Sequence, residues 1–480
     1  MSLASALNTT KSIFSNTSTQ TSVVSGNISS ATTSDYNRRT AVTTTNAYTG
    51  ATTVKVERTE DAALLKQVLQ SISDDSGQQS LLAGLETLNS VMGGDEYSAT
   101  PSEALTALRE ALQTYAASPS DATLAAAAVA AANDVATSLN QQTQAVQELR
   151  TDTDGDIATT VNTLNQLLSD FEKANNAVKS ATASGGDANN ALDTRESLLK
   201  QISEIIGIST TVRDNNDIAI YTTTGVTLFE TVPREVSFDA TPAYDANTVG
   251  NAVYIDGVAL PAGEGSSTSA AGSLQALLQL RDEVYPGYQN QLDEIARGTM
   301  LLFSETDAGG AAIAGLFTTV DASVVDFETA DIIPGLAGLI TVSSAAQADP
   351  NTLRDGDIAG VDQNTEGAAG YSDLLYKYVA GFETQMAFDA DADISTNATL
   401  LDFTSDSIGW VQEYRSDATT AAENTSAMLN RSEEAYSNAT GVNLDEELIL
   451  LLDIEQSYKA ASKLLSTIDE MLASLMEAAS

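Results

Sequence analysis

The most regular apolar pattern in the sequence lies at its C-terminal end. From residue 451, apolar side chains recur at alternating intervals of three and four positions, the period of a helix that packs along a partner. Gly441 precedes the pattern, Asn443 can cap a helix, and Asp445, Glu446 and Glu447 would occupy the first turn, where the helix dipole favours anions. With two leucines that precede it, this C-terminal stripe comprises Leu444, Leu448, Leu451, Ile454, Tyr458, Ala461, Leu465, Ile468, Leu472 and Leu475.

A weaker stripe with the same spacing opens the chain. Seventeen of the first 34 residues are Ser or Thr, which are mediocre helix formers, so a disordered Ser/Thr-rich tail is one interpretation. An ordinary pair of core helices is another. Because both stripes lie at the extreme ends of the chain, we expect them to pair as a coiled coil. The N-terminal stripe comprises Leu3, Leu7, Thr10, Phe14, Thr17, Thr21, Val24 and Ile28.

Helical spacing dominates the chain between the stripes. Helices are predicted within 60–118, with breaks at Gly93-Gly94 and Ser118-Pro119, and in the ranges 120–182, 193–207, 272–303 and 371–436. Asp193 and Glu196 have the spacing of a capping box for the helix at 193–207. After that helix the period changes to strand-like alternation, over 208–266, with Asp256-Gly257 as the expected hairpin turn.

These elements predict a mainly α protein with a small inserted β domain. The terminal helices would pair as a coiled coil beside a long helical bundle. The expected divisions are an N-terminal axial segment, a helical domain in two parts with the β domain inserted between them, and a C-terminal axial helix, at 1–59, 60–207, 208–266, 267–436 and 437–480. Two short segments, TSDYNRR at 33–39 and SNATG at 437–441, are expected to be linkers.

Composition removes several classes of function. The 480 residues include 66 acidic and 22 basic side chains, a formal net charge of -44, which disfavours nucleic acid and anionic lipid as partners. There is no Cys and no His, so disulfides, thiolate sites and the commonest ligands of transition metals are excluded. The first 34 residues contain no acidic side chain, in contrast to the rest of the chain.

Candidate chemistry is sparse. Asp152, Asp154 and Asp156 have the spacing of positions 1, 3 and 5 of a calcium loop. However, Gly155 stands at position 4, whereas the loop requires Gly at position 6, and Thr163 stands at position 12, where a bidentate Glu is required. A solvated turn that caps the next helix is therefore preferred. The segment at 389–395 fails the same test. No cofactor, metal or catalytic residues are predicted. The Ala-rich run at 122–136 is expected to be a tightly packed helix and not a membrane span.

Several segments resemble the bacterial flagellar axial proteins of the rod and hook, and most closely the hook-associated proteins. The C-terminal run GVNLDEELILLLDIEQSYKAASKLLSTIDEMLASL is similar to that family's ending, which hook and rod proteins share. The N-terminal SGNISSATTSDYNRR resembles the family's N-terminal motif at Asn27, Ile28, Tyr36 and Arg38, although Ser34-Asp35 replaces Pro-Gly. LDTRESLL and LQLRDEVYPGYQNQLDEIA resemble further family segments.

The resemblance implies a structural subunit at the junction between hook and filament, required for filament attachment. Such a subunit would be exported by the flagellar type III apparatus without a cleaved signal peptide and would be extracellular, without membrane insertion. Its expected partners are its own copies in a helical ring, the hook protein, the next hook-associated protein and a cytoplasmic export chaperone that covers the C-terminal stripe. The neutral N-terminal stretch would then lie in a densely packed inner tube.

Two alternatives remain open from the sequence. The nearer alternative is another axial protein, such as a hook protein or a flagellin. The more distant one is a secreted enzyme with its catalytic site in the β domain at 208–266, although the absence of His, Cys and a convincing acid pair disfavours an enzyme.

Overall fold

The structure is a computed structural model that describes residues 3–33, 35–45, 52–320 and 326–479. Helices dominate it and short strands occupy a smaller share, so the predicted mainly α class is confirmed. The chain forms two compact units. Unit 1 comprises residues 1–73, 164–235 and 425–480, and unit 2 comprises residues 74–163 and 236–424. The boundaries fall inside three helices, so each unit takes one part of α2, α4 and α12.

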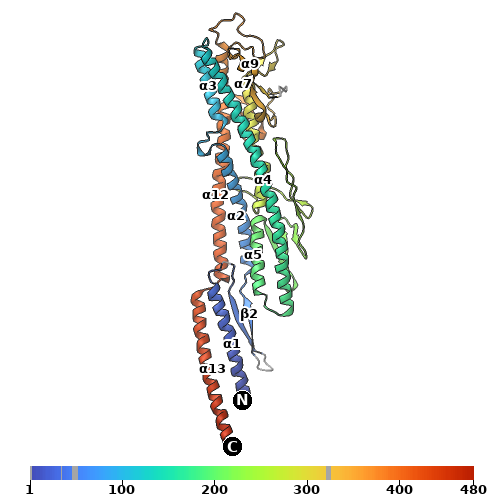
Figure 1. Cartoon of the computed structure of the whole chain (residues 1–480), viewed down its shortest axis with the longest axis vertical. Coiled ribbons are helices and arrows are strands. Elements are labelled where there is room, and N and C mark those ends of the chain that lie inside the picture. The colour runs from blue at the N-terminus through green and yellow to red at the C-terminus, as the bar shows by residue number, and fades with distance from the viewer. Residues whose placement is uncertain (1–2, 34, 46–51, 321–325, 480) are drawn as a thin grey trace. The chain divides into compact units, whose positions relative to one another are not determined.

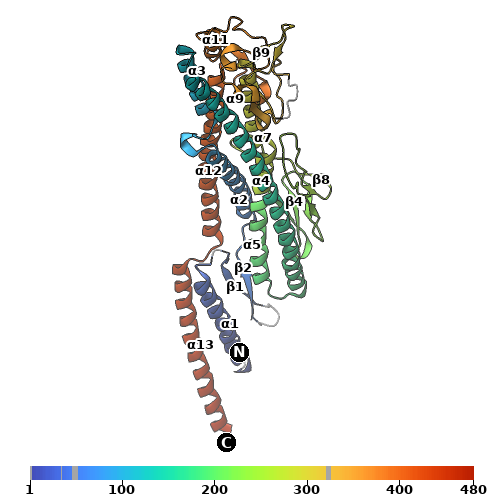
Figure 2. The same cartoon turned by 45° about the horizontal axis from the view of Figure 1, so that its top comes forward.

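Unit 1 contains both terminal helices. Figures 1 and 2 both show α1 and α13 side by side, with the two chain termini at the same end of the pair. The elements of unit 1 are α1 (Leu3–Ser30), β1 (Arg39–Thr45), β2 (Thr52–Arg58), the start of α2 (Ala62–Val91), the end of α4 (Ala122–Ser184), α5 (Asn189–Ile205), β3 (Ile208–Val212), η2 (Asp214–Asn216), β4 (Ile218–Thr222), β5 (Thr227–Phe229), the end of α12 (Leu400–Thr440) and α13 (Leu444–Ala479).

Two apolar clusters hold unit 1 together away from the terminal helices. Val68 and Ile72 of α2 pack against Tyr436 of α12. Phe171 of α4 meets Phe229 of β5 edge to face, with ring centroids 5.0 Å apart. The antiparallel strands β1 and β2 pair along their full length, with Arg39 opposite Arg58. This hairpin was not predicted, although the alternating β-branched residues of TAVTTT and TTVKVER are typical of strands.

Unit 2 is built around one large core. Its elements are the rest of α2, η1 (Gly94–Glu96), α3 (Pro101–Ala117), the start of α4, β6 (Val236–Ser237), β7 (Tyr254–Ile255), β8 (Val258–Ala259), α6 (Ser273–Gln279), the π-helical η3 (Leu280–Val284), α7 (Tyr285–Leu302), β9 (Glu305–Thr306), β10 (Ala312–Ile313), β11 (Phe317–Thr319), α8 (Leu336–Leu339), β12 (Ile340–Val342), α9 (Ser344–Ala348), α10 (Thr352–Asp355), α11 (Asp373–Gly381), β13 (Met386–Ala387), η4 (Ala390–Ala392), β14 (Asn397–Ala398) and the start of α12.

The predicted breaks at Gly93-Gly94 and Ser118-Pro119 fall between helices, as expected. The predicted continuous helix at 371–436 is wrong, because α11 ends at Gly381 and α12 begins at Leu400. The intervening segment is rich in Asp, Thr and Asn, which favour turns over helix, and it forms the short strands β13 and β14.

The strands of the segment at 208–266 are divided between the two units, whereas a single inserted β domain was expected. The sheet β3-β4-β5 belongs to unit 1, whereas the sheet β6-β7-β8 belongs to unit 2. The expected turn at Asp256-Gly257 is present between β7 and β8, and both residues have positive φ, 49° and 79°, as a type I′ hairpin turn requires.

Helix α4 corrects two expectations from the sequence. The calcium-like segment at 152–163 lies inside this helix, so it is neither an ion loop nor a capping turn. Asp154 is fully buried in unit 2, where it pairs with Arg281 Nη1 at 2.6 Å and accepts from the Tyr244 hydroxyl at 2.8 Å. These partners satisfy its charge, which explains how an Asp is accommodated in the helix interior.

The Ala-rich start of α4 is the tightly packed helix expected from the sequence. By length and composition α4 could span a membrane. However, Ala125, Ala128 and Ala132, spaced by three and four residues, are buried in the core of unit 2. This is the packing of a core helix, in which small side chains let neighbouring elements approach closely.

Candidate assembly interface at the paired terminal helices

Helices α1 and α13 run antiparallel and bury one narrow row of side chains on each helix. Among the described side chains of α13, the buried ones are Glu447, Ile454, Ala461 and Ile468, each seven residues after the last. Those of α1 are Thr10, Thr17 and Val24, with the same interval, and then Asn27. Seven-residue spacing is the repeat of a coiled-coil seam, because seven residues make almost two helical turns.

The seam accommodates threonine because its hydroxyl bonds within the helix. Thr17 Oγ1 donates to the carbonyl of Ile13 at 2.6 Å, so this buried hydroxyl is satisfied without a partner on α13. Beside it, Phe14 and Tyr458 meet edge to face, with ring centroids 5.1 Å apart. Thr21, which was expected on the seam, is exposed instead, and Asn27 is buried near the end of α1.

The predicted stripes are thus buried to different degrees. Val24, Ile454, Ala461 and Ile468 are buried, and Phe14, Ile28, Leu451, Leu465 and Leu472 are half-buried. Leu7, Leu444, Leu448 and Tyr458 are exposed. Leu3 and Leu475 lie in α1 and α13, but their side chains are outside the described ones.

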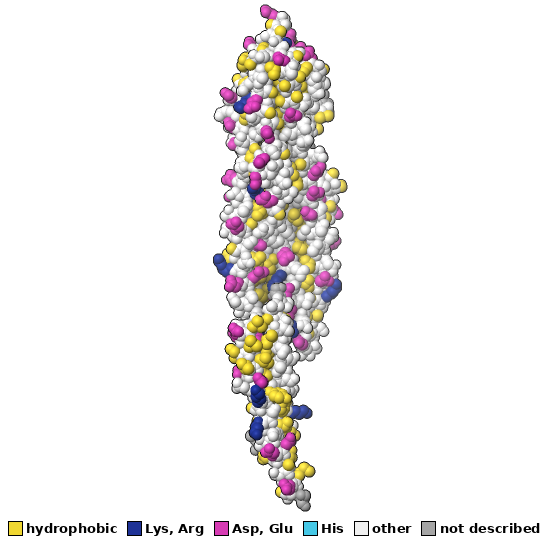
Figure 3. All heavy atoms as spheres, turned by 60° about the vertical axis from the view of Figure 1, so that its left-hand side comes forward, with side chains coloured by type: hydrophobic (Ala, Val, Ile, Leu, Met, Phe, Trp, Pro, Cys, Tyr) yellow, Lys and Arg dark blue, Asp and Glu magenta, His cyan; other side chains and the backbone are white. Residues whose placement is uncertain are grey.

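The free side of α13 carries many large apolar side chains. Figure 3 shows hydrophobic side chains gathered over this helix in the lower part of the view. The exposed members, with fractions of 37% to 71%, are Leu444, Leu448, Ile449, Leu450, Leu452, Tyr458, Leu464, Met471 and Met476. A stripe of this length is far more apolar than a solvated helix face needs to be, which is typical of a surface that another molecule covers.

A polar cluster ties the two helices together where α1 ends and α13 begins. The Asn27 amide group donates to Glu447 Oε2 at 3.1 Å and to the carbonyl of Arg39 at 2.8 Å. Its oxygen accepts from the Tyr36 hydroxyl at 2.8 Å and from the backbone N–H of Arg39 at 3.0 Å. Arg38 Nε donates to Glu447 Oε1 at 2.7 Å. We name Asn27, Tyr36, Arg38 and Glu447 the terminal cluster.

The terminal cluster is closely packed. Glu447 is fully buried and stands one heptad before Ile454, at the head of the buried row on α13. Burial raises the pKa of Tyr36, while the guanidinium of Arg39, which lies over its ring, opposes that shift. The backbone N–H of Arg38 also donates to the carbonyl of Thr440 at 2.8 Å. The chain segments that enter and leave the helix pair are therefore joined directly.

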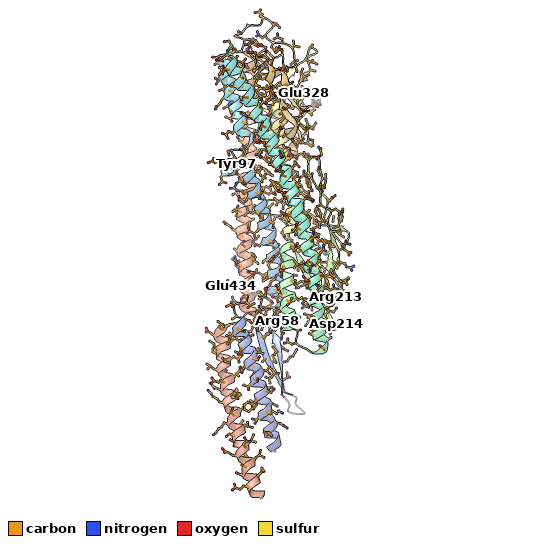
Figure 4. All side chains as sticks on the ribbon, viewed as in Figure 1. Arg58, Tyr97, Arg213, Asp214, Glu328 and Glu434 are labelled. Atoms are coloured by element: carbon orange, nitrogen blue, oxygen red, sulfur yellow. The ribbon has the colours of Figure 1, made fainter. Side chains whose placement is uncertain are left out.

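A second set of charges anchors these segments to α5. Arg58, at the end of β2 and labelled in Figure 4, donates to Asp193 at 2.6 Å and also to Glu196. Burial lowers the pKa of Arg58, but the charge of Glu196 and the hydrogen bonds that Arg58 donates to both carboxylates more than offset this and raise its pKa above the ordinary value. Arg39 Nη2 donates to Asp193 at 2.9 Å.

Asn37 completes this anchor. With its amide oxygen facing Arg58, it accepts from Arg58 Nη2 at 2.6 Å and from the Tyr436 hydroxyl at 2.9 Å. Burial raises the pKa of Tyr436, and the charge of Glu196 adds to the rise. Residues 37–39 of the predicted linker at 33–39 are thus held by α5 and α12 and do not form a free linker. At the other predicted linker, residues 437–440 are helical, and only 441–443 separate α12 from α13.

Several residues of this interface were assigned other roles from the sequence. Asp193 and Glu196 were expected to cap a helix, but α5 begins at Asn189 and both bind arginines instead. Glu447 lies in the first turn of α13, as expected, but it is buried there and also binds an arginine. Among the described residues, no group of acidic side chains is arranged to hold a metal ion.

Comparisons with known proteins show what the chain is similar to. The model of the flagellar hook-associated protein FlgK helical domain matches residues 85–319, and the model of the flagellar basal body rod FlgEFG protein C-terminal region matches residues 433–478. The first match covers just under half of the chain. The chain is thus similar to flagellar axial proteins, to hook-associated protein FlgK over its middle and to rod proteins at its C-terminal end. Glu447 lies inside the second match, whereas the N-terminal motif at Asn27 to Arg38, which contacts it, lies outside both.

Two individual proteins are also similar to parts of this chain. Flagellar hook-associated protein 1 of Bacillus subtilis (strain 168) is 23% identical over an alignment of 367 residues, and the match covers 70% of this chain and 68% of that protein. The solved flagellar hook junction protein FlgK from Burkholderia pseudomallei is 20% identical, with a TM-score of 0.43. That likeness covers 53% of this chain and less than half, 46%, of the solved chain. Both relatives are thus described as hook-associated or hook junction proteins of the flagellum.

Proposed function

We propose that this chain is a structural subunit of the junction between the flagellar hook and the filament, and that filaments attach only when it is present. The observation that carries the proposal is the terminal helix pair, in which α13 is packed against α1 on one side and leaves a long apolar side uncovered. Neighbouring copies in a helical ring, the hook protein and the next hook-associated protein would bury that side after assembly.

The uncovered apolar side of α13 should also need protection from aggregation before the chain is assembled. A long exposed apolar stripe favours aggregation, so a cytoplasmic export chaperone should cover α13 until the chain is exported through the flagellar type III apparatus. The N-terminal helix, without acidic side chains, suits dense packing around an axis, because like charges there would be desolvated together.

The test is filament assembly in a strain that lacks the gene for this chain. Electron microscopy should show hooks without filaments, with filament protein lost to the medium, and the wild-type gene should restore filaments. Ile468→Asp should fail to restore them and should weaken chaperone binding, because it places an unpaired charge at a buried seam position, at a cost of several kcal/mol.

Glu470→Gln, at an exposed position on the same helix, is the matched control and should restore filaments. The chain's single tryptophan, Trp410, lies in unit 2 and shows whether the Ile468→Asp protein is otherwise folded. If that variant assembled filaments and bound the chaperone normally, the role assigned to α13 would be wrong.

A second axial role has some support, because the family model matched at 433–478 is that of rod FlgEFG proteins. A hook or rod subunit would be distributed along the hook or rod. Labelled antibodies on intact flagella distinguish these roles, since a junction subunit should appear only where hook and filament meet.

A further inference from the structure

The apolar seam between α1 and α13 specifies which faces meet but leaves their register weakly determined. Its buried positions repeat every seven residues on both helices, so sliding one helix by a heptad, about 10 Å, again brings the two rows together. A one-heptad slide exchanges Thr10 with Thr17 on α1 and exchanges Ile with Ala461 on α13, so every seam position still holds a small or apolar side chain. The seam therefore discriminates poorly between the observed register and one shifted by seven residues.

The terminal cluster breaks this repeat. Asn27 follows Val24 by three residues instead of seven, and its amide meets the buried carboxylate of Glu447. A one-heptad slide of α1 toward the C-terminal end of α13 would place Asn27 opposite Ile454, where the amide would be buried without a polar partner. Glu447 would lose its hydrogen bond from Asn27. An unsatisfied buried amide is costly, so the slipped register is penalised at this one point.

The chain connections alone do not prevent such a slide. If Asn37 keeps its contacts with Tyr436, the six residues 31–36 connect it to the end of α1 at Ser30. An extended segment of that length reaches about 20 Å, about twice the length of the slide. The connection at 441–443 fixes only the start of α13.

We propose that Asn27, Glu447 and Arg38 form a register lock that positions α1 on α13. Buried polar pairs are best known to have this role in coiled coils, where they fix register at some cost in stability. The register has a consequence for assembly, since α13 has 36 residues and α1 has 28. The lock determines which part of α13 extends beyond α1, and so keeps Met471 and Met476 uncovered for contact with other molecules.

The absence of Cys from the chain makes the register measurable by cross-linking. In the full-length purified chain, Phe14→Cys with Tyr458→Cys reports the observed register, because these rings are in contact. Phe14→Cys with Leu465→Cys, seven residues further along α13, reports the slipped register. A short bis-maleimide reagent joins the pairs, and mass spectrometry of the digested protein quantifies each link.

The lock is removed by Asn27→Leu together with Glu447→Leu, which leave the seam apolar. The link from 14 to 465 should then rise about tenfold relative to the link from 14 to 458. Glu447→Gln should keep the observed register, because an amide at 447 can still accept from Asn27. Val24→Ala weakens the helix pair without touching the lock, so it should lower the native link without creating the slipped one.

The proposal is overturned if the 14 to 458 link still dominates in the double leucine variant, since the seam or the connections would then set the register. It is also overturned if both links disappear together, because the cluster would then only hold the helices in contact. Neither result bears on the junction role, which filament assembly tests separately.

Discussion

Unit 2 and the α1–α13 pair of unit 1 bury their apolar side chains in different ways. In unit 2, Phe303 lies at the centre of one continuous core and has ring contacts with Phe317, Tyr378 and Phe382, at centroid distances of 5.0 to 6.0 Å. In the helix pair, each helix buries about one side chain per heptad, and two of those on α1 are threonines. Two helices alone cannot enclose a side chain as a multi-element core does.

This difference indicates that the two regions gain their stability from different contacts. Unit 2 encloses its core within the chain, so its stability should depend on its own packing. The helix pair leaves Leu448, Leu452 and Leu464 in solvent, so much of its burial has to come from other molecules. The pair therefore resembles half of an interface, already folded but incomplete, and mutations in the two regions should have separable effects.

The largest effect is expected from the centre of the unit 2 core. Phe303→Ala removes a fully buried ring and leaves a cavity, which should lower the free energy of unfolding of unit 2 by about 3–5 kcal/mol. Denaturant unfolding followed by Trp410 fluorescence measures this, because the only tryptophan of the chain lies in unit 2.

Two variants that should not change this unfolding transition serve as controls. Val320→Ala changes an exposed side chain of unit 2 and should have little effect. Ile468→Ala removes a buried side chain of α13 and should leave the Trp410 transition where it is. If Ile468→Ala shifted that transition as much as Phe303→Ala, the two regions would unfold as one and the comparison would fail.

A smaller effect should distinguish buried carboxylates in the two regions. Glu447 of the helix pair is bound by an arginine, whereas Asp293 of unit 2 is held by neutral donors, the N–H groups of Gly335 and Ala337 at 2.9 and 2.8 Å and the amide of Gln289. Burial raises the pKa of Asp293 to about 7 despite these hydrogen bonds. The folded state then binds the proton more tightly than the unfolded state, in which the pKa of an Asp is about 3.9.

The free energy of unfolding of unit 2 should therefore fall as pH rises from about 4 to about 7. Above about pH 7, Asp293 is ionised in both states and causes no further loss. Relative to Asp293→Asn, whose amide does not titrate, the loss should be about 2–4 kcal/mol. Denaturant midpoints from Trp410 fluorescence at several pH values measure the difference. Parallel pH profiles for the two proteins would show that the neutral donors keep Asp293 ionised and that its burial has no such effect.

The parts of the fold that follow from local pattern could be predicted from the sequence. The 3,4 spacing of the C-terminal stripe, to which Ile454, Ala461 and Ile468 belong, predicts both the helix α13 and the face that it buries, because helical periodicity is a property of the segment itself. The same holds for the turn at Asp256-Gly257, whose residues tolerate positive φ. The alternating β-branched residues of β1 and β2 are an equally local signal, although this hairpin was not among the predicted elements.

The terminal cluster could not be predicted in this way. Asn27 and Glu447 are 420 positions apart, and Arg58 meets Glu196 across 138 positions. With 66 acidic residues in the chain, no local feature tells which carboxylate an arginine will meet. Resemblance to the family directed attention to Asn27, Tyr36 and Arg38, but only the fold shows that these side chains surround Glu447.

The smallest expected effect concerns the threonines that weaken the seam. Thr17→Val keeps the shape of the side chain and replaces a buried hydroxyl, bonded only to its own helix, with a methyl group that can pack against α13. The free energy of opening the helix pair should rise by about 0.5–1 kcal/mol. Amide hydrogen exchange between Ile454 and Ile468 should accordingly slow by about two- to fivefold. Thr21→Val is the matched control, because Thr21 is exposed and its hydroxyl also bonds to its own helix, at the carbonyl of Thr17. If Thr21→Val slowed exchange as much as Thr17→Val, the gain would come from the helix as a whole, and the narrow buried row would not be what holds α1 to α13.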